Sequence, residues 1–215
     1  MHTTRRLFQD TIKKIERWET FKTALFKENP ILLLLLGIWP VVALTKTAKE
    51  ALIFASITLL LLFFSNFFVS LFFRGVPYQR RTCVFLFLIA VEVTLLDYFL
   101  RLHYPTFRES LGIFLLLLVM NEVILSRTQT FAVRNNLILS CLDALGAGFG
   151  YVWGMMLVGC IREILGNGTI FGQIVFGKEF HKSPMLACNL SGFAFILLGF
   201  LIGFFRMINK REKRV

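Results

Sequence analysis

Asn121 and Glu122 interrupt an apolar run that extends from Leu111 to Leu125. An ionisable side chain at membrane depth is costly unless it faces a partner or a water-filled cavity, so this pair is the first candidate for function. A carboxylate in that position can serve as a proton or Na⁺ site. Two alternatives remain open beside ion handling: a hydrogen bond across a subunit interface, and a residual metal role.

Asp143 is the next ion-path candidate, because it also lies in a long apolar run. It precedes Gly146, Gly150 and Gly154, which follow one another at steps of four. Small residues with that spacing let a second helix approach closely, so these glycines are candidates for helix packing. Asp143 is one turn before Gly146 and has an alternative role as a bridge to a neighbouring helix.

No motif for catalysis or for metal binding is found beside these candidates. The four cysteines form no CxxC pair, and Cys141 and Cys160 are about 28 Å apart if they share one helix. His103 has no neighbouring ligand pattern. There is no nucleophile–base pair, phosphate-binding glycine loop or nicotinamide fingerprint. We therefore predict no catalytic residue, no metal ligand and no complete active site within this chain.

The composition is that of an integral membrane protein. Hydrophobic residues make up 56% of the 215, and the mean hydropathy is +0.70, whereas soluble domains are about 45–50% apolar. The net charge of +11 does not indicate nucleic-acid binding, because the basic residues are at the termini and in short links. Membrane lipid is the partner that this composition predicts.

The apolar runs predict an all-α protein with six transmembrane segments in a single membrane domain, residues 29–210. The segments are 31–44, 51–73, 82–100, 111–125, 137–165 and 185–205. Residues 1–28 have the spacing of an amphipathic helix on the membrane surface, and 209–215 form a basic tail.

Segments 1 and 4 are short, and the first is interrupted by Gly37 and Pro40. An offset of 83 residues places Trp39 on Glu122, so the chain divides into two repeats of three helices, about 29–105 and 106–208. Short or broken segments at matching positions of two halves indicate a functional site in a repeat-built membrane protein.

The basic residues predict the orientation. Of the 24 Lys and Arg residues, 17 lie before the first segment, in the second and fourth links, and after the sixth segment. The positive-inside rule therefore places both termini in the cytoplasm. Because three segments per repeat is an odd number, the two repeats are inserted in opposite orientations.

Four stretches resemble one known family: LGIWPVVALT at 36–45, SLGIFLLLLVMNEVILSRTQTFA at 110–132, CLDALGAGFG at 141–150, and REILGNGTIFG at 162–172. They are similar, in the same order, to the E subunit of Rnf electron-transport complexes and to the D subunit of the sodium-pumping NADH–quinone reductase, Nqr. The resemblance covers nearly all of the chain beyond Asn29.

This resemblance implies a multi-pass protein of the bacterial inner membrane. It would pair with a homologous subunit of opposite orientation, Rnf A-type or Nqr E-type, and with further subunits that couple electron flow to Na⁺ or H⁺ translocation. In that family, each of the two homologous subunits supplies two cysteines to a [2Fe–2S] cluster between them, since thiolates hold both redox states of iron.

Here the two cysteine positions are occupied by Trp39 and Glu122, which identifies a divergent member that lacks both cluster ligands. We expect a non-catalytic scaffold or ion-path subunit with no cofactor of its own. The alternatives are an independent inverted-repeat transporter that uses Glu122, and a purely structural assembly subunit.

Overall fold

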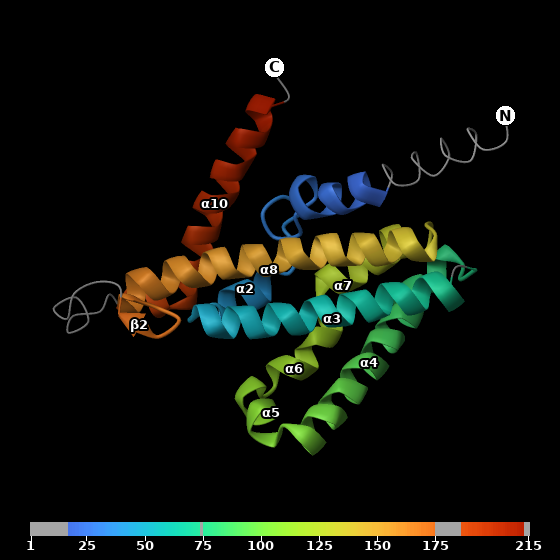
Figure 1. Ribbon diagram of the computed structural model, residues 1–215, viewed down its shortest axis with the longest axis horizontal. Helices are drawn as coiled ribbons and strands as arrows, with labels where there is room; N and C mark the ends of the chain where they lie inside the picture. The colour runs from blue at the N-terminus through green and yellow to red at the C-terminus, as the bar shows by residue number, and fades with distance from the viewer. Residues whose placement is uncertain (1–16, 74, 175–185, 213–215) are drawn as a thin grey trace, which may run out of the picture. The chain divides into compact units, whose positions relative to one another are not determined.

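The computed structural model describes residues 17–73, 75–174 and 186–212, and these residues are almost entirely helical (Figure 1). The all-α prediction is confirmed. The elements are a helix at 17–22 that continues into the π-helix η1 (Thr23–Lys27), then α2 (Ile38–Leu44), α3 (Ala48–Phe72), η2 (Tyr78–Arg80), α4 (Arg81–His103), α5 (Pro105–Leu111), α6 (Phe114–Leu117), η3 (Leu118–Met120), α7 (Glu122–Arg127), η4 (Thr128–Ala132), α8 (Leu137–Asn167), β1 (Thr169–Ile170), β2 (Gln173–Ile174), η5 (Leu186–Asn189) and α10 (Ser191–Glu212).

Within the part of the chain that the structure describes, four helical stretches are long and apolar enough to cross a membrane. They are Ala48–Phe72, Tyr78–His103, Phe114–Ala132 and Leu137–Asn167, and Ser191–Met207 is a shorter apolar helix. This chain is therefore a multi-pass membrane protein. The third stretch is a series of short helices from α6 to η4, and the segment predicted at 31–44 forms a helix only from Ile38 onward.

Two of the links between the predicted segments are largely helical, including the one at 101–110 that the sequence predicts as a loop. The link at 101–110 contains the last turn of α4 and most of α5, which begins with Pro105 at a position where proline costs no hydrogen bond. Arg108 Nε donates to Asp97 Oδ1 at 2.8 Å and ties α5 back to α4. The Asp97 hydrogen bond and charge raise the pKa of the half-buried Arg108 guanidinium. The link at 126–136 contains the end of α7 and the π-helix η4.

The chain forms two compact units, and the two long helices each contribute to both. The first unit comprises residues up to Leu25 and Thr58–Gly148; the second comprises Phe26–Ile57 and residues from Phe149 onward. The first unit thus holds the later part of α3, the series from α4 to η4, and the first part of α8. The second unit holds α2, the first part of α3, the later part of α8, and α10.

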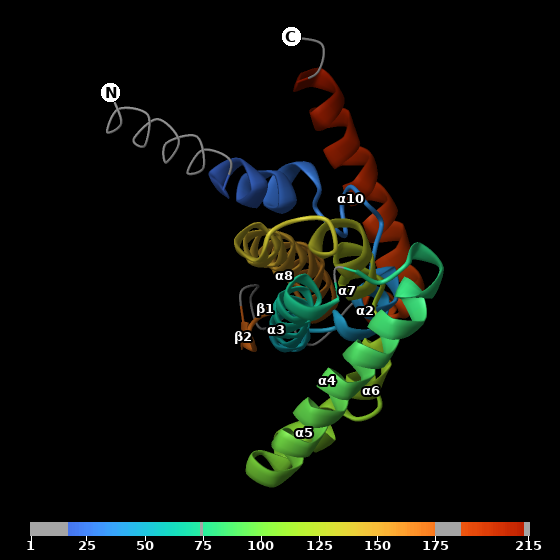
Figure 2. The same cartoon turned by 90° about the vertical axis from the view of Figure 1, so that its right-hand side faces the viewer.

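The core of the first unit is where α3, α4 and η4 meet. Val69, Phe85, Ala132 and Val133 are buried together. In both views α5 and α6 lie beside α4 (Figures 1 and 2), and η3, α7 and η4 also pack on it. These short helices cover one face of α4. The buried residues of α4 therefore repeat at helical spacing, from Phe85 through Ile89 and Val93 to Leu100.

The N-terminal helix of the first unit packs on α8. Ala24 is fully buried, whereas Trp18 is 57% exposed with the Lys22 ammonium 5.1 Å from its ring centroid. The predicted amphipathic segment 1–28 is described only from residue 17, so most of it lies outside the described residues, as do 213–215 of the predicted tail; α10 continues through the tail's beginning to Glu212.

In the second unit, α10 packs on α2, as Figure 2 shows near the base of α10. A small hairpin follows α8: Thr169 pairs with Ile174, and Ile170 pairs with Gln173. Its two turn residues, Phe171 and Gly172, both have positive φ, at 51° and 79°. Two left-handed residues in a two-residue turn match the twist of paired strands.

Candidate functional site

Helix α2 begins abruptly after a strained stretch of chain. Leu35 has φ 61° and Gly37 has φ 67°, so the backbone turns into the left-handed region twice before Ile38. A non-glycine residue there costs of order 1–3 kcal/mol and persists only where its surroundings impose it. Trp39 follows in the first turn of α2. It is half-buried and packs edge-on against Phe54, with 6.2 Å between the ring centroids.

Helix α7 also begins after a break. Asn121 is extended and fully buried, and its Oδ1 accepts the N–H of Val123 at 3.0 Å, which caps the helix. Among the described residues, its Nδ2 has no hydrogen-bond partner. Glu122 is the first residue of α7 and is exposed, and the neighbouring Met120 is 73% exposed.

Trp39 and Glu122 therefore share a local setting. Each lies in the first turn of a short helix that starts in the middle of an apolar segment. Of the ion-path candidates, Asn121 serves as a cap, and Glu122 reaches the surface of the first unit. A carboxylate exposed among residues such as Met120 needs a polar partner in a membrane.

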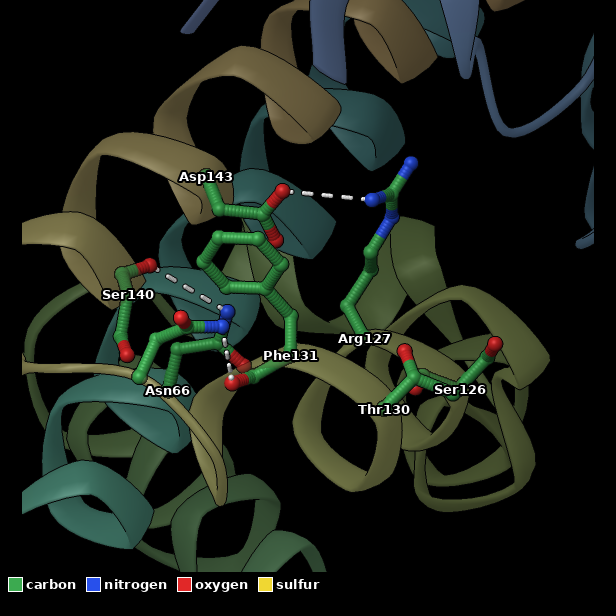
Figure 3. A network of polar contacts seen from close by, with 8 residues as sticks. Asn66, Ser126, Arg127, Thr130, Phe131, Ser140 and Asp143 are labelled. Carbon is green, nitrogen blue, oxygen red and sulfur yellow. Dashed lines mark hydrogen bonds and ion pairs between the residues drawn. The ribbon is translucent and has the colours of Figure 1, made fainter. Parts of the chain in front are cut away.

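Asp143, the third ion-path candidate, is in a buried ion pair. Its Oδ1 accepts from Arg127 Nη1 at 3.2 Å, and the two side chains are 2% and 4% exposed (Figure 3). The sequence places Arg127 only among the basic residues of a link. The one sequence signal for its burial is its position directly after the apolar run 111–125. Arg127 is the last residue of α7 and is buried in the first unit.

A band of small polar side chains lies next to this ion pair. Asn66 Nδ2 donates to the Ser140 carbonyl at 3.4 Å (Figure 3). Thr128 Oγ1 lies 3.2 Å from Asn66 Oδ1 and 2.6 Å from the Ile124 carbonyl, so its one proton is shared between two acceptors. Ser140 Oγ donates to Ser70 Oγ at 3.3 Å. These contacts join α3, α7, η4 and α8 through polar groups that would be costly to bury alone.

In the second unit, Arg162 holds the end of α2. It is among the largest fully buried side chains, and its Nη1 donates to Thr45 Oγ1 at 2.9 Å and to the Val42 carbonyl at 3.2 Å. Its Nε and Nη2 donate to the carbonyls of Cys188 and Leu190. A guanidinium has five donors in a planar fork. Arg162 therefore satisfies carbonyls at the end of α2 and before α10.

Glu163, the next residue, holds the start of α3 and the hairpin. Its Oε2 accepts the Ala48 N–H at 2.8 Å, and its Oε1 accepts the Gly172 N–H at 2.9 Å and the Thr169 hydroxyl at 3.0 Å. The carboxylate thus supplies acceptors for backbone groups that a helix start and a tight turn leave free.

The predicted packing glycines lie on α8 in two settings. A Cβ on Gly146 would be 2.7 Å from the Phe21 carbonyl oxygen, and one on Gly154 would be 2.9 Å from Ile31 Cδ1. Gly150 contributes its carbonyl, which accepts from Asn29 Nδ2 at 2.8 Å. Sequence reasoning missed two further close contacts, at Gly148 against Leu59 and at Gly159 against Ala51.

Comparison with known proteins identifies the family. Residues 17–202 match the profile described as Rnf-Nqr subunit, membrane protein. The chain belongs to the Rnf-Nqr family.

Three relatives, each named as the E subunit of its complex, show the extent of the similarity. The E subunit of the proton-translocating ferredoxin:NAD(+) oxidoreductase complex of Clostridium ljungdahlii is 34% identical to this chain, over 92% of each chain. The E subunit of the Na(+)-translocating ferredoxin:NAD(+) oxidoreductase complex of Acetobacterium woodii is 36% identical, over 88% of this chain and 94% of the relative. The E subunit of the ion-translocating oxidoreductase complex of Shewanella loihica is 38% identical, over 87% of this chain and 85% of the relative.

None of the four cysteines of this Rnf-Nqr chain is on α2 or α7. Cys83 is on α4, Cys141 and Cys160 are on α8, Cys188 is on η5, and all four are free. Among the residues that the structure describes, no group of three or more His, Cys, Asp or Glu side chains is placed to hold a metal ion.

Proposed function

We propose that this chain is a membrane subunit of an ion-translocating electron-transport complex of Rnf or Nqr type, and that it acts there as a scaffold or ion-path subunit. The observation that carries the proposal is the pair of short helices, each with its family ligand position in the first turn, occupied by Trp39 and Glu122. The relatives are named as the E subunits of such complexes.

The residues at these two positions do not fit a [2Fe–2S] cluster. Indole offers no lone pair for a metal, and a lone carboxylate is a hard ligand for a site that takes soft thiolates. Trp39 is also engaged with Phe54. The proposal therefore gives this chain no cofactor, and any cluster at the interface would be held by the partner.

Six transmembrane segments in two inverted repeats form the second part of the proposal. The two units support it, because each combines one short helix with parts of both long helices. The third helix of each proposed repeat packs on the short helix of the other repeat: α4 packs on α7, and α10 packs on α2. Such an exchange is expected where two similar halves interlock.

Matching contacts at Thr45 and Thr128 support the same symmetry. These residues are 83 apart, and each bonds through its hydroxyl to the carbonyl four residues earlier, Val41 and Ile124. Each also meets a polar side chain from the later part of a long helix. Arg162 of α8 contacts Thr45, and Asn66 of α3 contacts Thr128.

The proposed setting is the bacterial inner membrane with both termini in the cytoplasm, beside a homologous A-type Rnf or E-type Nqr subunit of opposite orientation and the other subunits of the complex. Exposure of Glu122 within an apolar segment supports a partner on that face. Asp143 is paired with Arg127, which favours a structural role for it.

Two other functions rest on specific observations. The exposed Glu122 is compatible with an independent transporter, in which Glu122→Gln would abolish Na⁺ or H⁺ flux in vesicles. The close contacts at Gly146 and Gly154 are compatible with a purely structural assembly role. In that case, Glu122→Gln would leave both flux and assembly unchanged.

The deciding experiment is purification of the chain in mild detergent with the subunits that accompany it, followed by iron and sulfide analysis and low-temperature EPR. We expect Rnf- or Nqr-type subunits to copurify, and any [2Fe–2S] signal to survive Glu122→Ala. Stoichiometric cluster lost in Glu122→Ala would refute the absence of ligands in this chain. Recovery of the chain without such subunits would refute its membership of the complex.

A further inference from the structure

Glu92 is a buried carboxyl group in the middle of α4 that the proposed function does not use. It is 8% exposed, and at about 1.5 Å per residue it lies roughly 16 Å from each end of the helix. Helix α4 is one of the four stretches able to cross a membrane. A charge at such a depth is expensive, so the group needs a cation, a metal or a proton.

Only one polar partner holds this carboxyl group among the described residues. Ser65 of α3 donates its hydroxyl to Oε2, whereas Oε1 has no hydrogen-bond partner there. Both residues belong to the first unit, and Ser65 is fully buried. One hydroxyl does not replace the hydration of an ionised carboxylate.

No cation among the described residues neutralises Glu92. The ion pairs seen among the described residues of the first unit join Arg127 to Asp143, and Arg101 and Arg108 to Asp97. The other charged or titratable groups on α4 and on the described elements packed against it are all exposed except the half-buried Arg81. They are Tyr78, Arg80, Arg81, Cys83, Tyr98, His103, Glu109 and Glu122. The charged residues of α3, Lys49 and Glu50, are in its first turn, roughly 22 Å from Ser65 along the helix.

The surroundings also do not supply the ligands of a metal cation. A hard cation takes a shell of several oxygen ligands. Elements α6 and η3, which pack on α4, have the sequences FLLL and LVM and contribute only hydrocarbon and thioether side chains. Among the described residues, the one hydrogen-bonding group that meets the carboxyl group is the Ser65 hydroxyl. A proton is the one ligand that this set can hold.

We propose that Glu92 is a reversible proton-binding site within the membrane-spanning part of this chain, with Ser65 as the residue that positions it. The site is separate from Glu122 and from the Arg127–Asp143 pair. Its proton neutralises the carboxylate, so an acid group remains at membrane depth and can exchange a proton when water reaches Oε1. Asn66, the residue after Ser65 in α3, forms its hydrogen bonds with Thr128 and Ser140 instead.

Infrared spectroscopy of the full chain in lipid nanodiscs tests this proposal. We expect a C=O stretching band of a protonated carboxyl group that disappears as the pH is raised and returns when it is lowered. Glu92→Gln removes that band, and Ser65→Ala moves it to higher frequency, because the carboxyl group loses its hydrogen bond. Glu109→Gln, a change at an exposed acid of α5, is the matched control and leaves the band unchanged.

Three results would overturn the proposal. The first is a band that persists unchanged in Glu92→Gln. The second is a band that Ser65→Ala does not move, which remains informative if Glu92→Gln fails to fold. The third is loss of the band on replacing choline chloride with NaCl at constant pH, which would assign the site to Na⁺. The purified chain suffices for this test, so its outcome is independent of membership of a complex.

Discussion

At the residue scale, the Arg127–Asp143 ion pair makes the sharpest prediction about stability. Removing one partner of a buried ion pair typically costs about 3–5 kcal/mol, because the other charge is left without compensation. We expect Arg127→Met to lower the free energy of unfolding by that amount, measured by denaturant titration in mild detergent. The double variant Arg127→Met/Asp143→Leu should recover most of the loss, since it removes both charges.

Arg101 provides the matched control for this pair. It is 64% exposed and lies 3.8 Å from Asp97, and exposed pairs contribute about 0–1 kcal/mol. Arg101→Met should therefore be nearly neutral. Additive losses in the Arg127 and Asp143 double variant would show that the two side chains do not stabilise each other.

At the scale of elements, the glycines of α8 differ in what faces them. A Cβ at Gly146 would meet a backbone carbonyl at 2.7 Å, whereas one at Gly154 would meet the flexible end of Ile31. A side chain can turn aside, but a helix backbone cannot without moving the whole element. We expect Gly146→Ala to destabilise by about 1–3 kcal/mol, the usual cost of overpacking, and Gly154→Ala to cost less. Thermal unfolding in detergent measures both.

Gly199 on α10 is the control for the helix propensity of alanine. No atom of the described residues lies within 4 Å of a Cβ placed there, so Gly199→Ala should be neutral or stabilising by up to about 1 kcal/mol. If Gly146→Ala behaved like Gly199→Ala, the N-terminal helix would not depend on close contact with α8.

The sequence predicts the long elements and misses the irregular ones, for a physical reason. The runs that form α3, α4 and α8 are apolar over more than 18 residues, and length alone identifies such helices. The sequence predicts a loop where α5 lies, although Pro105 marks a helix start, because the polar composition of 101–110 outweighs that signal. The positive φ of Leu35 has no local signal, since leucine rarely adopts it.

The candidate site is harder to predict because its contacts join distant residues. Arg162 reaches Thr45 across 117 positions, and Glu163 reaches Ala48 across 115. Both fall near the end of the segment predicted at 137–165, and the structure also has them near the end of α8, but the sequence does not identify their partners. Asn121 and Glu122 form one pair in the sequence, yet one is buried as a cap and the other is exposed. Adjacent positions on a helix start point in different directions, and only the fold decides which is covered.

At the scale of the whole molecule, the proposed inverted repeat predicts the side of the membrane on which each link lies. With both termini in the cytoplasm, the link around η2 is cytoplasmic, and the link that contains α5 is on the opposite side. The test uses two variants, Gln79→Cys and Thr106→Cys, each made in a chain whose four native cysteines are changed to serine. Both positions are exposed. A membrane-impermeant thiol reagent should label Thr106→Cys in intact cells, and Gln79→Cys only after the membrane is opened.

The same experiment separates this topology from its alternative. Helix α4 joins the two links and is long enough to cross the membrane once, so the two cysteines must react on opposite sides if α4 spans. Labelling of both from the same side would show that α4 does not cross, and three segments per repeat would fail. Labelling of Gln79→Cys alone in intact cells would show that α4 crosses the membrane but that the chain has the opposite orientation. That result would contradict the orientation predicted from the 17 basic residues on the proposed cytoplasmic side.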